Sequence, residues 1–382
     1  MMSRRIPLQK LLERHMSAKL LSLTFSAFLC AGAALAQSTP SPALLALSKH
    51  DHTLAIVDPV TLKIVARMPS GPDPHEVIAS SDGKLAYISN YGGGAFNTIT
   101  VVDLMAQMTV RMIDLGALRG PHGLDYAGGK LFFTAETNKV FGSYDPVSQK
   151  IDWVMGTGQD RTHMVIVSSD LNRIATSNVS SATISIFEKS KAGGPGGPPP
   201  GPGGPPPGAG NGPGGPPPGM PPGGPARGGM PVVNWVQTVI PVGRGSEGFD
   251  VSPDGKEIWS ANAQDGTVSV IDVAKKKVVA TLNANVGGAN RLKFTTDGKL
   301  VLISSLRQGD LTILDASTRE VTKRVPIGHG AAGIQMQPDG ARAFVACSPD
   351  NYVTVIDLKT LTVAGHLDVG GEPDGLAWAV RP

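Results

Sequence analysis

The chain has 382 residues, of which 41% are hydrophobic and 17% are charged, and its formal net charge is +3. Five basic residues and one acidic residue fall within the first 36 positions, and removing them leaves 29 basic and 30 acidic residues. This balance disfavours a general binder of nucleic acid or other polyanions, which needs a basic surplus or a dense basic patch.

Residues 1–36 have the pattern of an export signal. Basic residues precede an apolar run over 20–35, and Ala34-Leu35-Ala36 fits the small-residue rule for signal peptidase. We expect cleavage before Gln37, a short linker over 37–41, a periplasmic or secreted protein, and no transmembrane segment after processing. An uncleaved anchor is the alternative. The start codon is either Met1 or Met16, because a start at Met16 would by itself give a compact signal.

From residue 42 onward, one pattern of four short segments recurs, with the apolar–polar alternation of half-buried strands. The clearest copy begins at Ser246 and reads SEGFDVSPDGKEI, WSANAQDG, TVSVIDVAKK and KVVATLNANVGG. The third segment occurs seven times, as TLAIVD from Thr53, TITVVD from Thr98, VFGSYD from Val140, TISIFE from Thr183, TVSVID from Thr267, LTILD from Leu311 and YVTVID from Tyr352. Seven copies predict seven structural units.

The length of the unit predicts its architecture. First strands begin around residues 75, 122, 163, 247, 290, 332 and 374, so their spacing is 41 to 47 residues except for one gap of 84. Four strands in about forty to forty-five residues are the signature of a β-propeller blade. The chain begins with strands two to four of one unit, over 44–68, and ends with a lone first strand over 375–380. The sequence therefore predicts an all-β, seven-bladed β-propeller over 42–382, which both termini close within one blade. We expect it to be a monomer.

Two blocks of this repeat resemble a known family. SPDGKEIWSANAQDGTVSVIDVAKKKVVATL and PDGARAFVACSPDNYVTVIDLKTLTVAGHLDVGGEPDG are similar to the YVTN-type β-propeller repeats of exported bacterial and archaeal surface proteins. The resemblance spans 42–380 apart from one insertion, and it implies the propeller fold and export. It implies no particular activity, because such repeats occur in enzymes, in binding proteins and in parts without known chemistry.

The insertion covers residues 192–231, within the fourth unit, and holds 16 of the 32 prolines. It has almost no apolar side chains to bury, so we expect polyproline II interrupted by glycine. It joins strands three and four, which places it on the face opposite the predicted site. It is either a tolerated surface loop or an arm that binds a protein partner or the cell envelope through proline motifs.

Cysteine usage excludes two features of the processed chain. Only Cys347 remains after cleavage, so no internal disulfide can form, and no Cys-x-x-Cys-His occurs for c-type heme. Cys347 lies in a predicted second strand, where a buried inert thiol is expected.

The connections between blades carry the candidate site. In propellers of this family, the connection from strand four to the next strand one lies on the face that usually carries the ligand. The equivalent positions at the ends of these connections are His75, His122, His163, Glu247, Asn290, Ala332 and Asp374. Because first strands line the central channel, we expect these side chains to form a ring around its mouth.

The residue types in this ring predict its chemistry. Imidazoles and carboxylates on rigid strands could hold a divalent metal, with His75, His122, His163 and Glu247 as ligands, or act as proton donor and acceptor. Further ligand-binding candidates in or beside the same loops are Asn90, Arg119, Glu136, Arg161, Arg244 and Arg291. The arginines could hold an anionic ligand by paired hydrogen bonds. The alternative is a structural mouth, in which histidines satisfy loop carbonyls.

We expect an exported binding or scaffold protein with a small molecule or an envelope protein at this mouth. The alternative is a hydrolase or lyase. Asn90-Tyr91-Gly92-Gly93-Gly94, preceded by His75-Glu76, resembles the start of propeller lactonases that open sugar lactones. That resemblance covers about one blade and implies His75 or Glu76 as the base that activates water; His122 and His163 are the other catalytic candidates. No cofactor is predicted beyond the divalent metal that the ring could hold.

Overall fold

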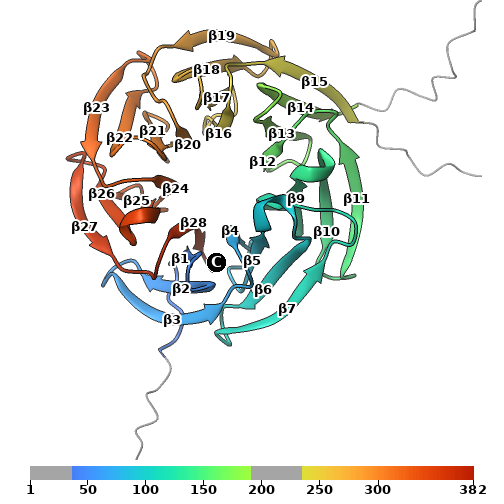
Figure 1. The fold of residues 1–382 in the computed structure, drawn as a ribbon, viewed down its shortest axis with the longest axis vertical. Helices are drawn as coiled ribbons and strands as arrows, with labels where there is room; N and C mark the ends of the chain where they lie inside the picture. The colour runs from blue at the N-terminus through green and yellow to red at the C-terminus, as the bar shows by residue number, and fades with distance from the viewer. Residues whose placement is uncertain (1–36, 191–234) are drawn as a thin grey trace, which may run out of the picture. The chain divides into compact units, whose positions relative to one another are not determined.

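A computed structural model describes residues 37–190 and 235–382. Seven four-stranded antiparallel sheets surround a central channel (Figure 1). The predicted all-β, seven-bladed propeller is therefore confirmed. The predicted signal over 1–36 and the proline-rich insertion over 192–231 lie outside the described residues.

The blades are numbered along the chain, and each is given from its innermost to its outermost strand. Blade 1 contains β28 (Pro373–Ala379), β1 (Ala43–Ser48), β2 (Thr53–Asp58) and β3 (Lys63–Pro69). Blade 2 contains β4 (Pro74–Ala79), β5 (Leu85–Asn90), β6 (Thr98–Asp103) and β7 (Met108–Asp114). Blade 3 contains β8 (Pro121–Ala127), β9 (Lys130–Ala135), β10 (Val140–Asp145) and β11 (Lys150–Gly156). Blade 4 contains β12 (Thr162–Val167), β13 (Arg173–Asn178), β14 (Thr183–Lys189) and β15 (Trp235–Pro241).

The remaining blades follow the same order. Blade 5 contains β16 (Ser246–Val251), β17 (Glu257–Asn262), β18 (Thr267–Asp272) and β19 (Lys277–Leu282). Blade 6 contains β20 (Ala289–Phe294), β21 (Leu300–Ser305), β22 (Asp310–Asp315) and β23 (Val321–Pro326). Blade 7 contains β24 (Ala331–Met336), β25 (Arg342–Cys347), β26 (Tyr352–Asp357) and β27 (Thr362–Leu367). Within the described parts of the chain, three short 3-10 helices follow second strands: η1 (Gly92–Gly94), η2 (Glu136–Asn138) and η3 (Ser348–Asp350).

Both ends of the described chain meet in blade 1. β28 pairs with β1 in antiparallel register, with Leu44 opposite Trp378 and Leu45 opposite Ala377. The C-terminal strand thus lies beside the N-terminal one at the centre of the ring (Figure 1). This pairing removes the open edge that an unclosed ring would leave and confirms the predicted closure.

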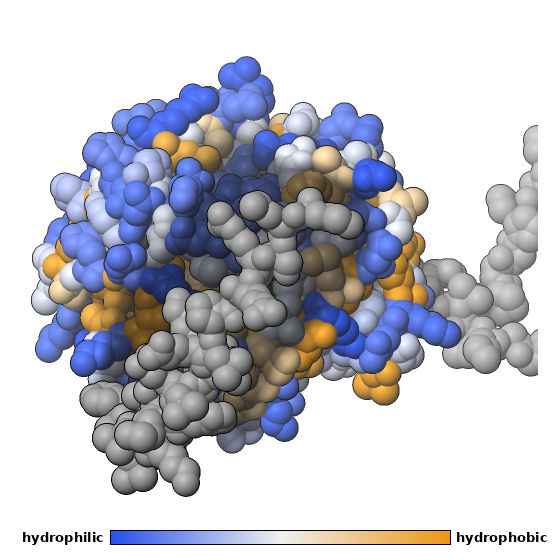
Figure 2. All heavy atoms as spheres, turned by 60° about the horizontal axis from the view of Figure 1, so that its bottom comes forward, coloured by the Kyte–Doolittle hydropathy of each residue, from blue (hydrophilic) through white to orange (hydrophobic). Residues whose placement is uncertain are grey.

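The core lies between neighbouring sheets. Middle strands bury both faces, as in β1, whose six residues are all buried, because each sheet packs against another on either side. Outer strands alternate exposed and part-buried residues, as β7 and β11 do. On the visible surface, hydrophilic side chains predominate and apolar ones occur in small groups between them (Figure 2). Cys347 is buried, as expected. Among the described residues there is no helix with the length and apolar character needed to span a membrane.

Each innermost strand departs from regular pairing near its start. In β4, for example, Pro74 pairs with Asn90 and the next ladder pair is Val77 with Ile88, so His75 and Glu76 lie in a bulge. Comparable register shifts occur in all seven sheets. A bulge frees two side chains from the ladder and re-aims them, which here means toward the channel.

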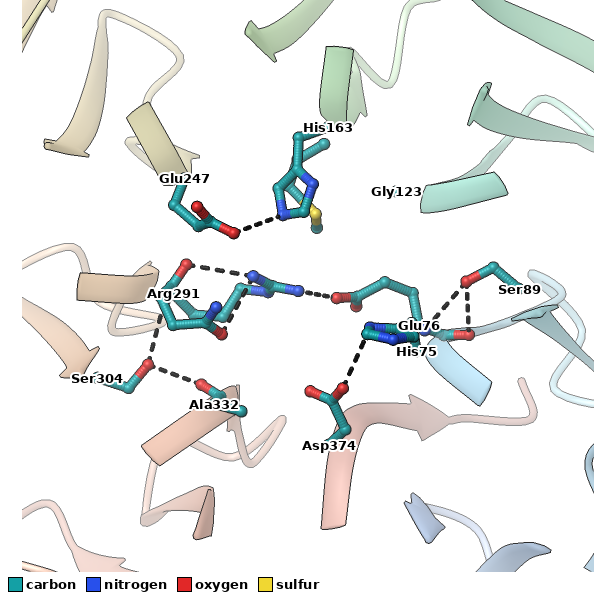
Figure 3. Close-up of polar contacts among 12 residues, drawn as sticks. His75, Glu76, Ser89, Gly123, His163, Glu247, Arg291, Ser304, Ala332 and Asp374 are labelled. Carbon is teal, nitrogen blue, oxygen red and sulfur yellow. Dashed lines mark hydrogen bonds and ion pairs between the residues drawn. The ribbon is translucent and has the colours of Figure 1, made fainter. Parts of the chain in front are cut away.

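In blades 1, 3, 5 and 7 the third residue of the innermost strand is a glycine, which lets the next blade approach closely. Gly123 occupies this position in blade 3, and a Cβ atom there would stand 2.5 Å from the carbonyl oxygen of His163 in blade 4. The Thr134 hydroxyl accepts a hydrogen bond from Gly123 N–H and donates one to that same carbonyl, at 2.9 and 2.8 Å. Ser304 links Arg291 N–H to the carbonyl of Ala332 in the same way (Figure 3). The bulges are therefore fixed against the neighbouring strands.

Candidate ligand site at the channel mouth

The seven predicted ring positions are the second residues of the seven innermost strands, so they lie at one end of the channel. Figure 3 shows His75, His163, Glu247 and Asp374 directed toward its centre. The structure thus brings together the histidines and carboxylates that the repeat placed in equivalent positions. Ala332 contributes only a buried methyl group.

The three histidines are in contact. The ring centroids of His75 and His122 are 5.1 Å apart, and those of His122 and His163 are 3.8 Å apart. Tyr91 stands edge-on to His75 and His122 at 4.8 and 5.1 Å. His122 is buried, and its Nδ1 has no hydrogen-bond partner among the described residues. Burial, reinforced by the charges of His163 and other cations, holds the pKa of His122 well below its usual range, so this imidazole is neutral.

His163 is held between two carboxylates. Its Nδ1 bonds Glu136, and its Nε2 lies 3.2 Å from Glu247 Oε1. Arg161 reaches the same two acids, with Nε 3.4 Å from Glu136 and Nη2 3.2 Å from Glu247. Burial acts to lower the pKa of His163, but the adjacent acids outweigh it and raise that pKa. Burial likewise opposes ionisation of Glu247, yet His163 and Arg161 lower its pKa to about 2. In this cluster the cationic side chains of His163 and Arg161 are therefore balanced by the carboxylates of Glu136 and Glu247.

His75 has a second group of partners. Its Nδ1 lies 3.3 Å from Asp374 and its Nε2 3.4 Å from Asp73, while Lys49 Nζ is 3.1 Å from the same Nε2. The hydrogen bond with His75 lowers the pKa of Asp73 to about 2 despite partial burial. Burial raises the pKa of Asp374, opposed by the charges of His75 and Lys49.

An ion pair crosses the channel below the ring. Arg291 of β20 and Glu76 of β4 are third residues of their strands, and their side chains meet across the channel axis (Figure 3). Arg291 also donates to the side chain and the carbonyl of Asn290, both at 3.2 Å. Both charged side chains line a cavity of ≈ 190 Å³ further along the channel, together with Met164 and Lys293. The pair thus forms the floor of the mouth.

Several predicted residues lie elsewhere or serve the fold. Asn90 is fully buried inside blade 2, where its Nδ2 donates to Thr98 and Thr100, so it cannot contact a ligand without rearrangement. Arg119 donates to the carbonyl of Ala95 at the surface. Arg244 pairs with Asp265, and its side chain is 73% exposed. The structure therefore separates these three from the histidine cluster, whereas Glu136, Arg161, Asn290 and Arg291 join it.

Sequence reasoning missed Lys49, Asp73 and Tyr91. Lys49 and Tyr91 directly follow the second strands of blades 1 and 2, just as Glu136 follows that of blade 3. Extending the alignment of the repeats by one residue beyond each second strand would have found them. Asp73 precedes an innermost strand by one residue and carries a positive φ of 44°, which the repeat pattern did not indicate.

The geometry disfavours the predicted metal ligands. Among the described residues, no three or more His, Cys, Asp or Glu side chains are grouped so that they could hold a metal ion. Both ring nitrogens of His163 face carboxylates, and both of His75 have polar neighbours. Glu76, a candidate base for lactone opening, is committed to Arg291. The arrangement instead provides a preorganised set of hydrogen-bond donors backed by acids.

Comparison with known proteins gives partial matches. A family model described as the cytochrome D1 heme domain matches residues 229–336. Antigen Lp49 of Leptospira interrogans is 25% identical over 150 residues, which are 34% of this chain and 33% of that protein. Dihydro-heme d1 dehydrogenase of Pseudomonas aeruginosa is 33% identical over 108 residues, 28% of this chain and 20% of that enzyme. The chain thus matches a third or less of the length of either relative.

Solved structures resemble the chain over most of its length. A functionally unknown protein from Desulfotomaculum acetoxidans has a TM-score of 0.68 at 12% identity, covering 90% of this chain and all of the other. A putative 6-phosphogluconolactonase from Bacteroides uniformis has a TM-score of 0.65 at 14% identity, with 88% and 99% covered. At these identities the likeness shows the fold alone. Together the comparisons support a β-propeller with distant similarity to heme d1 propeller proteins.

The mouth does not fit a heme iron held by its histidines. Iron ligation requires a ring nitrogen with a free lone pair facing open space. Both nitrogens of His75 have polar neighbours within 3.4 Å, and His163 bonds Glu136 through Nδ1. The Nε2 of His163 makes no hydrogen bond among the described residues, but it is buried and faces Glu247 at 3.2 Å, and His122 is only 4% exposed with its Nδ1 buried. The family match over 229–336 also contains none of the three. The cationic groups that face outward, Lys49 and Arg161, suit carboxylates rather than a metal.

Proposed function

We propose that this protein is an exported β-propeller that binds a small carboxylate-bearing ligand at its channel mouth. The proposal rests on how far each charged side chain of the mouth is exposed to solvent. The side chains of Arg161 and Lys49 are 40% and 25% exposed, whereas those of Glu136, Asp374 and Glu247 are 5%, 10% and 15% exposed. Asp73, which lies beside Lys49, is 32% exposed, so it is on the Arg161 side of the mouth that an entering ligand meets a cationic donor first.

The acids behind these donors are part of the proposed mechanism. Glu136 and Glu247 hold the Arg161 guanidinium in place, so less side-chain freedom is lost when a ligand binds. An arriving carboxylate would accept charge-assisted hydrogen bonds from Arg161 and Lys49. With Arg291 and Glu76 as the floor, the ligand enters and leaves through one face.

The comparisons bear on the chemical class of the ligand. Tetrapyrroles carry several carboxylates, and the partial matches to a heme d1 domain and to dihydro-heme d1 dehydrogenase favour a ligand of that class. In this protein such a ligand would be held through its carboxylates. Export to the periplasm or beyond is supported by the sequence pattern over 1–36.

Equilibrium binding tests the proposal. The probes are metal-free uroporphyrin, a polycarboxylate tetrapyrrole, and citrate, a carboxylate without a macrocycle, each titrated into the chain from Gln37 to Pro382. We expect Arg161→Gln to weaken binding about tenfold, the loss of one charge-assisted hydrogen bond. Arg244→Gln is the matched control, because that arginine is exposed and remote from the histidines.

The two probes separate the alternatives. Binding of uroporphyrin alone identifies a tetrapyrrole site, whereas similar affinity for citrate identifies a general carboxylate site. The proposal would be contradicted if neither probe bound. It would also be contradicted if Arg161→Gln and Arg244→Gln weakened probe binding equally.

A further inference from the structure

A groove on the outer rim of the propeller lies between blades 3 and 4 and encloses ≈ 460 Å³. Its lining is mainly aromatic and aliphatic, and includes Phe132, Trp153, Met155, Leu171 and Trp235. Trp153 belongs to β11 and Trp235 to β15, the outermost strands of the two blades, which are neighbours in the ring (Figure 1). Apolar side chains thus line a concave surface far from the channel mouth.

The two indole rings of the groove are held in place. Their centroids are 6.4 Å apart at an interplanar angle of 41°. Trp153 is fixed edge-to-face by Phe132 and Phe141, at 6.0 and 5.5 Å, and the Lys189 ammonium lies 5.5 Å from the Trp235 ring. The groove therefore presents preorganised aromatic faces.

Both indole N–H groups of the groove lack an acceptor among the described residues. Neither Trp153 nor Trp235 donates a hydrogen bond to another residue within 37–190 or 235–382, whereas the indole of Trp259 donates to Glu257 at 2.7 Å. Neither ring is fully buried. A ligand that offers carbonyl oxygens and apolar rings would satisfy both donors and cover both faces.

The described residues on either side of the proline-rich insertion lie at this groove. Lys189, the last residue of β14, pairs with Trp235, the first residue of β15, and both line the groove. The intervening sequence contains proline triplets at 198–200, 205–207 and 216–218, and no charged residue from 192 to 226. Proline-rich chains have carbonyls that lack internal donors, and they bind grooves lined by aromatic rings.

We propose that a proline triplet of this insertion docks in the groove of its own chain, on Trp153 and Trp235. A triplet in polyproline II spans about 9 Å, enough to cover two rings 6.4 Å apart. The segment is uncharged and most of the groove lining is apolar, with Lys130, Asp152 and Lys189 as its charged members. Because the segment is attached to the propeller at both ends, its effective concentration at the groove is roughly millimolar. A weak contact is therefore sufficient for high occupancy.

Indole N–H signals in nitrogen-15 NMR spectra test this docking. The chain has four tryptophans, so the four signals can be assigned with Trp153→Phe and Trp235→Phe. We compare the chain from Gln37 with a variant that lacks 193–230. The Trp153 and Trp235 signals should differ between the two, while those of Trp259 and Trp378 stay in place and report an intact fold.

A synthetic peptide of residues 195–218 provides the converse test. Added to the deletion variant, it should move the two signals back toward their positions in the full chain, and a peptide with serine in place of every proline should not. Replacing the nine triplet prolines by serine in the full chain should reproduce the spectrum of the deletion. This second variant keeps the length of the insertion if the deletion itself disturbs folding.

Two outcomes would overturn the inference. Identical Trp153 and Trp235 signals in the full chain and both variants would show that the insertion does not occupy the groove. Signals that depend on protein concentration, together with a dimer in sedimentation, would assign the groove to the insertion of a second copy.

Discussion

Replacing Arg291 tests whether the ion pair across the channel stabilises the ring. Arg291→Met removes one charge and leaves the Glu76 carboxylate, whose side chain is 13% exposed, without its partner. Breaking a buried pair in this way typically costs about 3–5 kcal/mol. We expect about 3 kcal/mol, the lower end, because the cavity of ≈ 190 Å³ beside Glu76 is large enough to admit water.

The two single variants should differ. Glu76→Gln leaves Arg291 near the negative charges of Asp374 and Glu247, which also favour its charged form. Arg291→Met instead leaves Glu76 facing Asp374, a like charge. We therefore expect Glu76→Gln to cost less, about 1–2 kcal/mol.

Urea unfolding followed by circular dichroism supplies the free energies, and the double variant Arg291→Met/Glu76→Gln completes the cycle. If the two groups act as a pair, the double variant should be more stable than the sum of the single losses implies, with a coupling of about 2 kcal/mol. A coupling below about 0.5 kcal/mol, or a larger loss for Glu76→Gln than for Arg291→Met, would refute this reasoning.

Three further predictions concern the mouth and its support. The pKa of His122 is depressed in the folded protein, where the imidazole is neutral, so below about pH 6.5 only the unfolded chain binds this proton and stability falls as pH drops. In His122→Phe, the urea concentration at the unfolding midpoint should therefore decrease less between pH 7 and pH 5 than in the unmodified chain. Glu247 has a pKa of about 2 in the folded protein, so its ionised carboxylate stabilises the fold above its usual pKa of 4.5, and this stabilisation is lost as pH falls toward 2. Glu247→Gln should therefore lower the free energy of unfolding by about 3 kcal/mol at pH 7 and make stability less sensitive to acid. Equal losses at pH 7 and pH 2 would show that the loss does not come from the ionisation of Glu247. Gly123→Ala should cost about 1–3 kcal/mol, because its Cβ would meet the His163 carbonyl at 2.5 Å, whereas Gly156→Ala, with open space around it, should change the melting temperature little.

The repeat allowed most of the architecture to be predicted from the sequence. Period-two alternation and constant spacing determine which strands share a sheet, and counting units predicts both the blade number and the closure of β28 on β1. The same register placed His75, His122 and His163 at equivalent positions, and their contact follows from the narrow channel.

Side-chain pairing beyond the repeat could not be predicted. Arg291 and Glu76 are 215 residues apart and come from non-adjacent blades, so their contact depends on the channel diameter and on the bulge that re-aims both. Asn90 lies one residue before Tyr91, yet one side chain turns into the blade and the other toward the histidines. Alternation along a strand does not extend into a loop, which is why the repeat could not separate these two neighbours.

Closure of the ring by β28 has a consequence for how the protein is made. The innermost strand of blade 1 is synthesised after all the other strands of the propeller, so until then β1 pairs with β2 alone and the inner edge of its ALLALS segment is unpaired. A nascent or prematurely terminated chain exposes that segment as a template for pairing with other chains. Even a short truncation at the C-terminus should therefore produce aggregation rather than a slightly smaller propeller.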